Sequence, residues 1–538
     1  MSHKNKSTYK QLFSTSLLKL VSIISLSMFL FSCATHQQKA PGNSYRVNIG
    51  DTHLSKLISS SVNKRSSELG GFRLLHNGME ALASIIYLTN TAQASIDLQY
   101  WSLHQDKTGQ LVIHHLLKAA DRGIRVRLLL DDFVARGGNS NLFTLAKHPN
   151  IDVKLYNPIS RRKWLRGLSM LTRFKRVNRR MHNKAFIVDN SVAIVGGRNI
   201  GDAYYIAKQN YLYRDLDVMT IGSSARKVSD SFDAYWNAKW AVRIEKLNKR
   251  LFLPIGYKNK RKQLANKARL FMSGEYWKAL SKINVSRAFL NPDQYFVWAR
   301  YKVLFDPPNK IKGIKKSNRR FLEHIMATHM ANATDNVKLI TPYFIPQRFG
   351  LKWIKQLSKK GVSVSVLTNS FAANDFSLSH GGYQRYRKRL LKNGVKLYEF
   401  KRSALKKERA GIYWFKNKPV ARLHAKSIII DNRYIYVGSV NLTPRSRYLN
   451  TETSILIDST QLAKQMDKTF TELAKQKNSY QLSLKKVVSI DDEGEQQEGY
   501  DISWKSNGKH NTNHEPEVSV FKHLTISILS LFPIEDLM

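Results

Sequence analysis

Eight residues of this 538-residue chain have the types and spacing needed to act on a phosphodiester. They form two sets with identical internal spacing: His182, Lys184, Asp189 and Asn199, then His424, Lys426, Asp431 and Asn441. Each member of the second set lies 242 positions after its counterpart (424 minus 182). A neutral imidazole is a nucleophile and a proton carrier near neutral pH, and lysine and asparagine donate to phosphoryl oxygens. The sets are therefore suited to nucleophilic and acid–base chemistry on an anionic group, with one histidine as the nucleophile and the other as the proton carrier.

The residues that follow each histidine predict strands that position this chemistry. Ala185 to Val188 is an apolar, β-prone run. Residues two apart on a strand share a face, so the histidine and the lysine before this run project together. Asp189 begins a turn, and Val192 to Val195 predicts a returning strand that leads to Asn199. Asp189 and Asp431 thus stand at strand ends, and the sequence leaves open whether they are catalysts or structural turn residues.

The repeat extends beyond the two sets. Val153 to Tyr156 and Val395 to Tyr398 share the sequence Val-Lys-Leu-Tyr and also lie 242 positions apart (395 minus 153). Strand patterns alternate with helical patterns in both halves, which is typical of βαβ units. A repeat of this length indicates a duplicated domain rather than a solenoid. We expect an α/β fold in which two lobes pack about a pseudo-two-fold axis and bring both histidines to one cleft.

The doubled His-x-Lys-x4-Asp pattern is followed each time by Gly-(Gly/Ser)-x-Asn, and this arrangement resembles the phospholipase D superfamily. Most of the chain is similar to the C-type, lipoprotein-like branch of the bacterial cardiolipin synthases. The resemblance implies two duplicated phospholipase D-like sandwich lobes, a phosphohistidine intermediate, and neither a cofactor nor a metal ion. It also implies His182 as the nucleophile, although the symmetric motifs by themselves leave that choice open.

Each histidine needs a carboxylate that orients its other ring nitrogen. Asp217 and Glu452 follow the two motifs at positions that resemble the orienting acids of the family, whereas we expect Asp215 to be a bystander. His380 lies in a segment that resembles the acceptor side of the family's active site. A surface histidine without a catalytic role is the alternative for His380.

The chain divides into six expected parts. They are a lipoprotein-type signal peptide with a lipobox (1–33), a tether (34–66), the first phospholipase D-like lobe (67–250), a connecting segment (251–330), the second phospholipase D-like lobe (331–480) and a C-terminal extension (481–538). Phe296 to Phe305 predicts a strand in the connecting segment. Apolar residues at helical spacing between 520 and 531 predict a helix that packs on the body, with membrane contact as the alternative.

The N-terminus predicts export and lipidation. Basic residues precede a short apolar run, Leu20 to Phe31, which is too short to span a bilayer. Cys33 is the only cysteine, which excludes a disulfide within the chain, and it ends a lipobox-like Leu-Phe-Ser-Cys sequence. We expect lipid attachment at Cys33 and a place in the bacterial cell envelope, at the outer membrane facing the periplasm. A single membrane-anchoring helix is the alternative.

The charge balance favours an anionic partner. Lys and Arg number 88 against 39 Asp and Glu, for a net charge of +49, which suits phospholipid membranes or nucleic acid. Basic residues alternate with aromatic ones before each histidine, in Arg161 to Arg180 and in Lys406 to Lys418. This mixture favours an anionic bilayer surface, with a solvated basic loop as the alternative. We expect an anionic phospholipid membrane and phospholipid substrates as partners, and neither nucleic acid nor an obligate protein partner.

Several functions fit these observations. The leading one is phosphatidyl transfer that makes cardiolipin from two phospholipids. A phospholipase D that releases phosphatidic acid, with water as the acceptor, would use the same motifs. A nuclease of the same superfamily would also suit a basic surface. A basic surface lipoprotein without catalytic activity is the remaining alternative, and the intact catalytic sets count against it.

Overall fold

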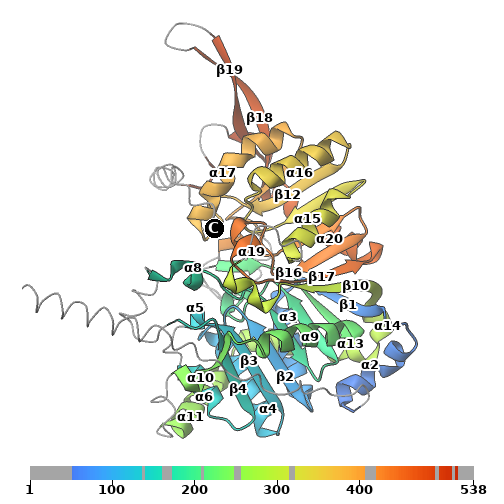
Figure 1. Ribbon diagram of the computed structural model, residues 1–538, viewed down its shortest axis with the longest axis vertical. Helices are drawn as coiled ribbons and strands as arrows, with labels where there is room; N and C mark the ends of the chain where they lie inside the picture. Colours follow the sequence, from blue (N-terminus) through green and yellow to red (C-terminus); the bar gives the residue numbers. More distant parts are fainter. Residues whose placement is uncertain are drawn as a thin grey trace, which may run out of the picture. The chain divides into compact units, whose positions relative to one another are not determined.

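The fold is built on a mixed β-sheet whose strands come from both halves of the chain (Figure 1). All the elements named below belong to one compact unit, residues 43–538. The computed structural model describes residues 51–135, 140–159, 172–207, 211–247, 256–313, 321–405, 420–490, 496–511 and 515–518.

The first half contributes eight neighbouring strands to this sheet. Their order in space is β9 (Ala241–Arg243), β4 (Ile151–Tyr156), β3 (Arg125–Asp131), β2 (Ser95–Tyr100), β5 (Ala185–Val188), β6 (Val192–Gly196), β8 (Asp217–Gly222) and β1 (Leu69–Leu75). Strands β2, β3 and β4 are parallel, and the remaining pairings are antiparallel. The parallel strands are almost entirely buried, and the buried Arg127 of β3 is paired within the sheet with Asp97 of β2 at 2.6 Å.

The second half repeats this order in the opposite direction along the sheet. Its strands are β17 (Thr453–Asp458), β16 (Tyr434–Gly438), β15 (Ser427–Ile430), β11 (Asn336–Ile340), β12 (Ser363–Asn369), β13 (Lys396–Phe400), β18 (Ser479–Ile490), β19 (Gln496–Ser506) and β20 (Lys509–Asn511). Strands β17 to β13 correspond to β8 to β4. Strands β15 and β16 lie 242 positions after β5 and β6 (427 minus 185, and 434 minus 192). The expected duplication into two α/β lobes is therefore confirmed.

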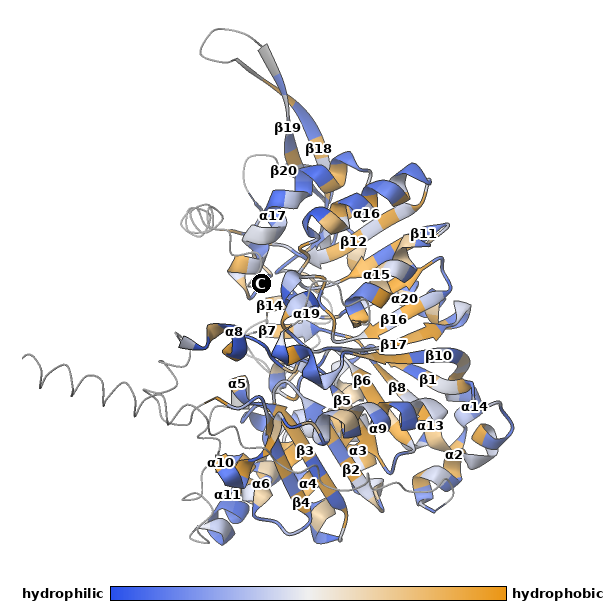
Figure 2. Cartoon of the chain, viewed as in Figure 1, coloured by the Kyte–Doolittle hydropathy of each residue, from blue (hydrophilic) through white to orange (hydrophobic). Residues whose placement is uncertain are grey.

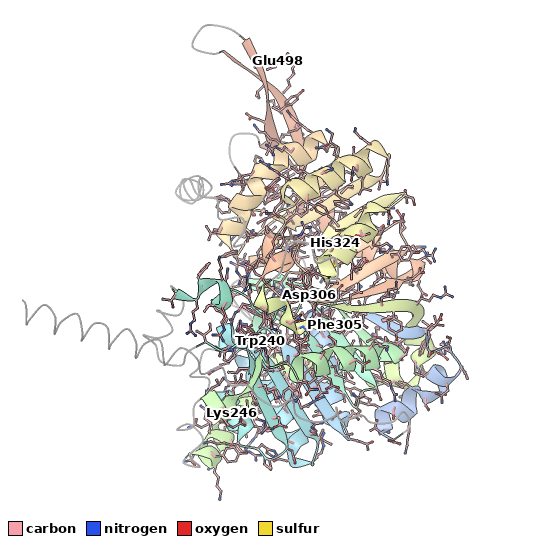
Figure 3. All side chains as sticks on the ribbon, viewed as in Figure 1. Trp240, Lys246, Phe305, Asp306, His324 and Glu498 are labelled. Atoms are coloured by element: carbon pink, nitrogen blue, oxygen red, sulfur yellow. The ribbon has the colours of Figure 1, made fainter. Side chains whose placement is uncertain are left out.

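One strand of the connecting segment joins the two lobes. Strand β10 (Val297–Phe305) pairs with β1 of the first half and with β17 of the second, so the hydrogen-bonded order is continuous. This strand matches the prediction for Phe296 to Phe305. The residue that follows it, Asp306, lies between the two halves (Figure 3). The connecting segment is thus part of the sheet rather than a linker outside it.

Helices cover both faces of the sheet. They are α2 (His53–Asn63), α3 (Gly78–Thr91), α4 (Lys107–Asp121), α5 (Asp132–Ala135), α6 (Ser140–Ala146), α8 (Phe174–Val177), α9 (Ser223–Trp236), α10 (Ile244–Leu247), α11 (Tyr257–Met272), α12 (Glu275–Ser281), α13 (Ser286–Leu290), α14 (Pro292–Tyr295), α15 (Leu322–Ala331), α16 (Gln347–Lys359), α17 (Ser377–Lys392), α19 (Pro444–Tyr448) and α20 (Thr460–Ala474). Helices α3 and α4 share a core with one face of the first-half strands, and α15, α16 and α17 do so in the second half.

The central core lies where the halves meet. It combines buried residues of α9 and α20 with inward-facing residues of strands from both halves, such as Phe72, Val195, Val437 and Ile455. The strands of the first half are coloured mostly hydrophobic, whereas the visible faces of α16 and α17 are mainly hydrophilic (Figure 2). Because the two halves bury apolar surface against each other, each half depends on the other for a complete core.

Several predictions fall outside the described residues. These are the signal peptide with Cys33, residues 34–50 of the tether, most of the basic segment before His182, the basic segment before His424, and the helix expected between 520 and 531. The described part of the expected tether forms helix α2, which buries Leu54 and Ile58 in the core, so the tether prediction is wrong there. Among the residues that are described, no helix is both long and apolar enough to cross a membrane. The expected boundaries of the six parts remain predictions.

Candidate active site

Backbone pairing between the two halves brings each histidine to an acid of the other half. The short strands β7 (Tyr211–Arg214) and β14 (Val420–Leu423) pair in parallel, with Arg214 opposite Leu423. The next residues along the two strands are Asp215 and His424. An isolated bridge likewise pairs Met181 with Thr451, one residue before His182 and Glu452. A parallel backbone pairing between the lobes therefore positions both histidine–acid pairs, and each pair requires both lobes.

His182 is held by Glu452. Its Nδ1 atom lies 2.8 Å from Glu452 Oε2, and its backbone nitrogen donates to Thr451 O at 2.8 Å. The Glu452 carboxylate also accepts from Ser439 Oγ at 2.5 Å and from Ser446 Oγ at 2.7 Å. Burial alone would raise the pKa of Glu452, but His182 and Lys184 hold that pKa below its usual value. An ionised carboxylate only accepts, so Nδ1 of His182 carries the proton and Nε2 has a free lone pair.

His424 is held by Asp215. Its Nδ1 atom lies 2.5 Å from Asp215 Oδ2, and its backbone nitrogen donates to Arg214 O at 2.8 Å. Burial would raise the pKa of Asp215, but His424 and Lys426 lower it to about 2. Asp215 is therefore ionised and fixes the same tautomer at His424 that Glu452 fixes at His182.

The prediction that Asp217 orients a histidine and that Asp215 is a bystander is wrong. Asp217 Oδ2 lies 2.8 Å from the buried guanidinium of Arg198, whose NH2 group also donates to Asp215 O at 2.6 Å. The reason is the register, because the β7–β14 pairing places residue 215, rather than residue 217, beside His424. Asp217 and Arg198 instead support the backbone that carries Asp215.

The two motif lysines are buried, and each bonds to the backbone carbonyl of its own motif histidine. Lys184 Nζ donates to His182 O at 2.7 Å, and Lys426 Nζ donates to His424 O and lies 2.9 Å from His424 Nδ1. Burial lowers the pKa of Lys184 to about 7 and that of Lys426 to about 8. Nearby charges also act on both pKa values, and the positive charge of Lys426 lowers the pKa of Lys184. Two buried ammonium groups that sense each other favour a bound anion such as a phosphodiester.

Both imidazoles are neutral at neutral pH. Burial lowers the pKa of His182 to about 4, against the opposing charge of Glu452. Burial also lowers the pKa of His424, and the positive charge of Lys426 acts in the same direction. A neutral imidazole with a fixed tautomer is the form that attacks phosphorus.

The motif asparagines are buried beside the histidines. Asn199 Nδ2 donates to Tyr204 Oη at 2.9 Å, and the Tyr204 ring lies 5.1 Å from the His424 ring. The backbone nitrogen of Asn441 donates to Ser446 Oγ, a residue that also holds Glu452. The Oδ1 atoms of both asparagines are buried without a hydrogen-bond partner. Their role as donors to phosphate remains a prediction.

Asp189 and Asp431 each accept hydrogen bonds from the backbone. The Asp189 carboxylate accepts from three consecutive backbone N–H groups, those of residues 93 to 95, at 2.9 to 3.1 Å. Asp431 does the same for residues 334 to 336. Each aspartate lies at the far end of the four-residue strand that starts near its motif histidine. A strand of four residues is about 13 Å long, so the aspartate is that far from the histidine along the strand. This geometry favours the structural role of the two that the sequence left open, and the choice between them stays a prediction.

His380 is buried, so the alternative of a surface histidine is wrong, and its place on the acceptor side stays a prediction. Its Nε2 atom lies 2.9 Å from Glu515 Oε2, and its ring stacks on Phe371 at 4.7 Å. Arg387 pairs with the same glutamate and also with Glu399 at 3.4 Å. The segment around Glu515 thus packs into the second lobe, where it fixes α17.

Sequence reasoning missed two groups of residues that support the site. Asp306 is buried, pairs with the buried Lys310 at 2.7 Å, and accepts from the backbone nitrogen of Glu452 at 3.0 Å. Trp101 lies 5.9 Å from the His182 ring, and Tyr213 lies 4.9 Å from the His424 ring. The Asp306-Pro-Pro sequence indicated only a turn, because its partner is distant along the chain. Within the described residues, no cluster of His, Cys, Asp or Glu has the arrangement of a metal site.

Comparison with known proteins identifies the family. The family model described as "Cardiolipin synthase, PLD-like domain" matches residues 85–240 and 326–474, which include both motifs. This chain belongs to that family. Cardiolipin synthase C of Escherichia coli (strain K12) is 36% identical over 467 residues, covering 86% of this chain and 95% of that protein. Cardiolipin synthase 1 of Bacillus anthracis is 23% identical over 409 residues, covering 76% of this chain and 67% of that protein.

A solved structure agrees with the fold of this family member. The crystal structure of phosphatidylserine synthase from Haemophilus influenzae Rd KW20 superposes with a TM-score of 0.52 at 16% identity, covering 79% of this chain and 91% of that one. This likeness concerns the fold alone. The resemblance to the phospholipase D superfamily and to cardiolipin synthases is thus confirmed.

Proposed function

We propose that this cardiolipin synthase family member is a phosphatidyltransferase that moves a phosphatidyl group from one phospholipid to a hydroxyl group of another. The observation that carries the proposal is the pair of neutral histidines, each fixed by a carboxylate of the other lobe, with a buried lysine bonded to the backbone carbonyl of each histidine. The name of the Escherichia coli relative, cardiolipin synthase C, supports cardiolipin as the product.

In the first step, Nε2 of His182 attacks phosphorus. Before this step, His424 takes up a proton from water at Nε2 as the phosphate binds. A nitrogen–phosphorus bond then forms, the bond from phosphorus to the alcohol oxygen breaks, and the leaving oxygen takes that proton from Nε2 of His424. Lys184 and Lys426 neutralise the charge on the non-bridging oxygens. The phosphate in turn offsets the positive charge that lowers the pKa of His424, and so favours the imidazolium that this step needs.

In the second step, the hydroxyl oxygen of the acceptor attacks the phosphohistidine. An oxygen–phosphorus bond forms, the nitrogen–phosphorus bond breaks, and the hydroxyl proton passes to Nε2 of His424. His182 is restored as a neutral imidazole, with its Nδ1 proton still held by Glu452. Proton transfer of this kind contributes about 10²- to 10⁴-fold to the rate.

The proposal includes attachment to the cell envelope through Cys33. The basic run, the short apolar run and the lipobox-like sequence support a lipid anchor at the outer membrane, facing the periplasm. The net charge of +49 supports contact with an anionic phospholipid surface. A Cys33→Ser protein should lose metabolically incorporated palmitate. Mature wild-type protein that retains residues 1–32 would refute the lipidation.

Mass analysis of lipids tests the activity. Purified protein is incubated with phosphatidylglycerol vesicles, with and without phosphatidylethanolamine, and the products are identified. Cardiolipin is the expected product, and a His182→Ala protein is the matched control. Phosphatidic acid alone would instead identify a hydrolase. Cleavage of DNA without any lipid product would identify a nuclease and refute the proposal.

A further inference from the structure

The surroundings of the two histidines differ in polarity. Beside His182 lie two apolar rings, Trp101 at 5.9 Å and Phe133, which stacks on Trp101 at 6.0 Å. Beside His424 lie the phenol rings of Tyr204 at 5.1 Å and Tyr213 at 4.9 Å. One end of the site is therefore apolar and the other carries hydroxyl groups.

A carboxylate completes the polar end. Asp375 lies in the loop between β12 and α17, and it accepts hydrogen bonds from Tyr213 Oη at 2.6 Å and from Tyr343 Oη at 2.5 Å. Tyr213 comes from the first lobe and Tyr343 from the second. Asp375 as a residue is exposed to solvent. One tyrosine ring separates this carboxylate from His424.

The repeat shows that this carboxylate is specific to one end. Tyr343 lies 242 positions after Trp101 (343 minus 101), so the polar ring at one end corresponds to an apolar ring at the other. Phe133 lies two residues after β3, whereas Asp375 lies in a longer loop after β12. The duplicated scaffold is therefore modified at the His424 end by hydroxyl groups and a negative charge.

We propose that Asp375, held between Tyr213 and Tyr343, binds the free hydroxyl groups of the alcohol that leaves or enters at His424, and so makes the enzyme prefer polyol acceptors. This inference rests on the proposed transferase function. A carboxylate has about four acceptor positions, and the two tyrosines use two of them. A glycerol-like headgroup donates hydroxyl hydrogens to the remaining positions, and such charge-assisted bonds are roughly twice as strong as neutral ones.

The direction of the reaction agrees with this assignment. The leaving and the entering alcohol both exchange their proton with the same histidine, so they use the same end of the site. The end with hydroxyl groups and a carboxylate suits an alcohol, and the end with Trp101 and Phe133 suits the apolar part of the phosphatidyl group. Asp375 does not touch phosphorus, so it determines specificity rather than the chemical step.

A competition between two alcohols tests the proposal. The donor is a short-chain phosphatidyl-p-nitrophenol, which brings no polyol, and glycerol and 1-propanol are present at equal concentrations. Both acceptors have three carbons and differ only in hydroxyl groups. Mass analysis gives the ratio of phosphatidylglycerol to phosphatidylpropanol. We expect the wild type to favour glycerol, and Asp375→Asn and Asp375→Ala to lower the ratio about tenfold, because the charged acceptor is lost.

Two further variants separate specificity from stability. Tyr343→Phe keeps the ring but removes a hydroxyl that orients Asp375, so it should lower the ratio by a smaller factor. Asp501 lies on β19, and its exposed carboxylate pairs with Lys388 of α17. Asp501→Asn removes this carboxylate and should change neither the rate nor the product ratio. Ratios within twofold of wild type in both Asp375 variants would overturn the alcohol site alone. A wild type that yields only phosphatidic acid would overturn the transferase function and the alcohol site together.

Discussion

The two histidine centres share one scaffold but differ in what surrounds them. Each histidine follows a backbone pairing with the other lobe, and each donates a hydrogen bond from Nδ1–H to a carboxylate. The carboxylate at His182 is a glutamate supported by Ser439 and Ser446, whereas at His424 it is an aspartate. The rings beside His182 are apolar and those beside His424 are phenols.

This difference shows how a duplicated scaffold supports two roles. The pairing geometry is conserved between the halves because it fixes the tautomer, which both a nucleophile and a proton carrier need. The rings and loops after the strands carry no such constraint, so they differ between the two ends. Symmetry in the backbone thus sets the reactive groups, and asymmetry in the loops assigns their tasks.

The largest expected effect separates nucleophile from acid. Replacement of His182 or His424 by Ala should lower turnover of phosphatidylglycerol by at least about 10³-fold, because the two groups act as a unit. With p-nitrophenol as the leaving group, no acid is needed. His424→Ala should then release one equivalent of nitrophenol in a burst, whereas His182→Ala should release none. Absorbance in a stopped-flow instrument measures the burst.

A burst of nitrophenol in the other variant would reverse the roles of the two histidines. A burst with His182→Ala and none with His424→Ala would make His424 the nucleophile and assign the apolar end to the alcohol. Equal and near-normal turnover in both variants would refute a shared site altogether.

The second prediction contrasts Asp215 with Asp217. Asp215→Asn and Glu452→Gln should each lower kcat about 10²- to 10⁴-fold with little change in stability, because the wrong histidine tautomer becomes accessible. Asp217→Asn should instead lower the free energy of unfolding by about 3 kcal/mol, because the buried Arg198 loses its charge partner. Kinetics of the folded protein and chemical denaturation of each variant distinguish the two outcomes. A loss of kcat confined to Asp217→Asn would restore that residue as the orienting acid.

The sequence predicted the repeat, but it missed how the acids pair with the histidines. The constant spacing of His182 and His424 requires two equivalent strand pairs, and apolar runs define those strands locally. Asp215 and Asp217 are only two positions apart, and the choice between them depends on the pairing of β7 with β14, which lie more than 200 residues apart. Asp306 escaped notice for the same reason, since its contact with Glu452 is distant along the chain.

The third prediction concerns pH and the two lysines. A lysine binds phosphate only while charged, and burial lowers the pKa of Lys184 to about 7 and that of Lys426 to about 8. As the pH rises through these values the charges are lost, so kcat/KM should fall by about tenfold per unit between about pH 7 and 8, and more steeply above about pH 8, where both lysines lose their charge. Arginine stays charged, so Lys184→Arg should move the first decline to higher pH, at some cost in maximal rate. An alkaline decline at the same pH in this variant would exclude Lys184 as its source.

The smallest effect on activity is expected at the two aspartates at the strand ends. Asp189→Asn and Asp431→Asn each weaken a carboxylate that accepts from three backbone N–H groups, far from the histidines. Asp189 is fully buried and Asp431 is partly exposed, so water replaces the lost bonds only at Asp431. The free energy of unfolding should therefore fall by about 3 kcal/mol for Asp189→Asn and about 1 kcal/mol for Asp431→Asn. Turnover per folded molecule should stay within about twofold of wild type, since neither carboxylate reaches a reacting atom. Denaturant titration and initial rates of the same samples measure both quantities. A large loss of turnover with unchanged stability would return these aspartates to the catalytic set and break the equivalence of the two strand ends.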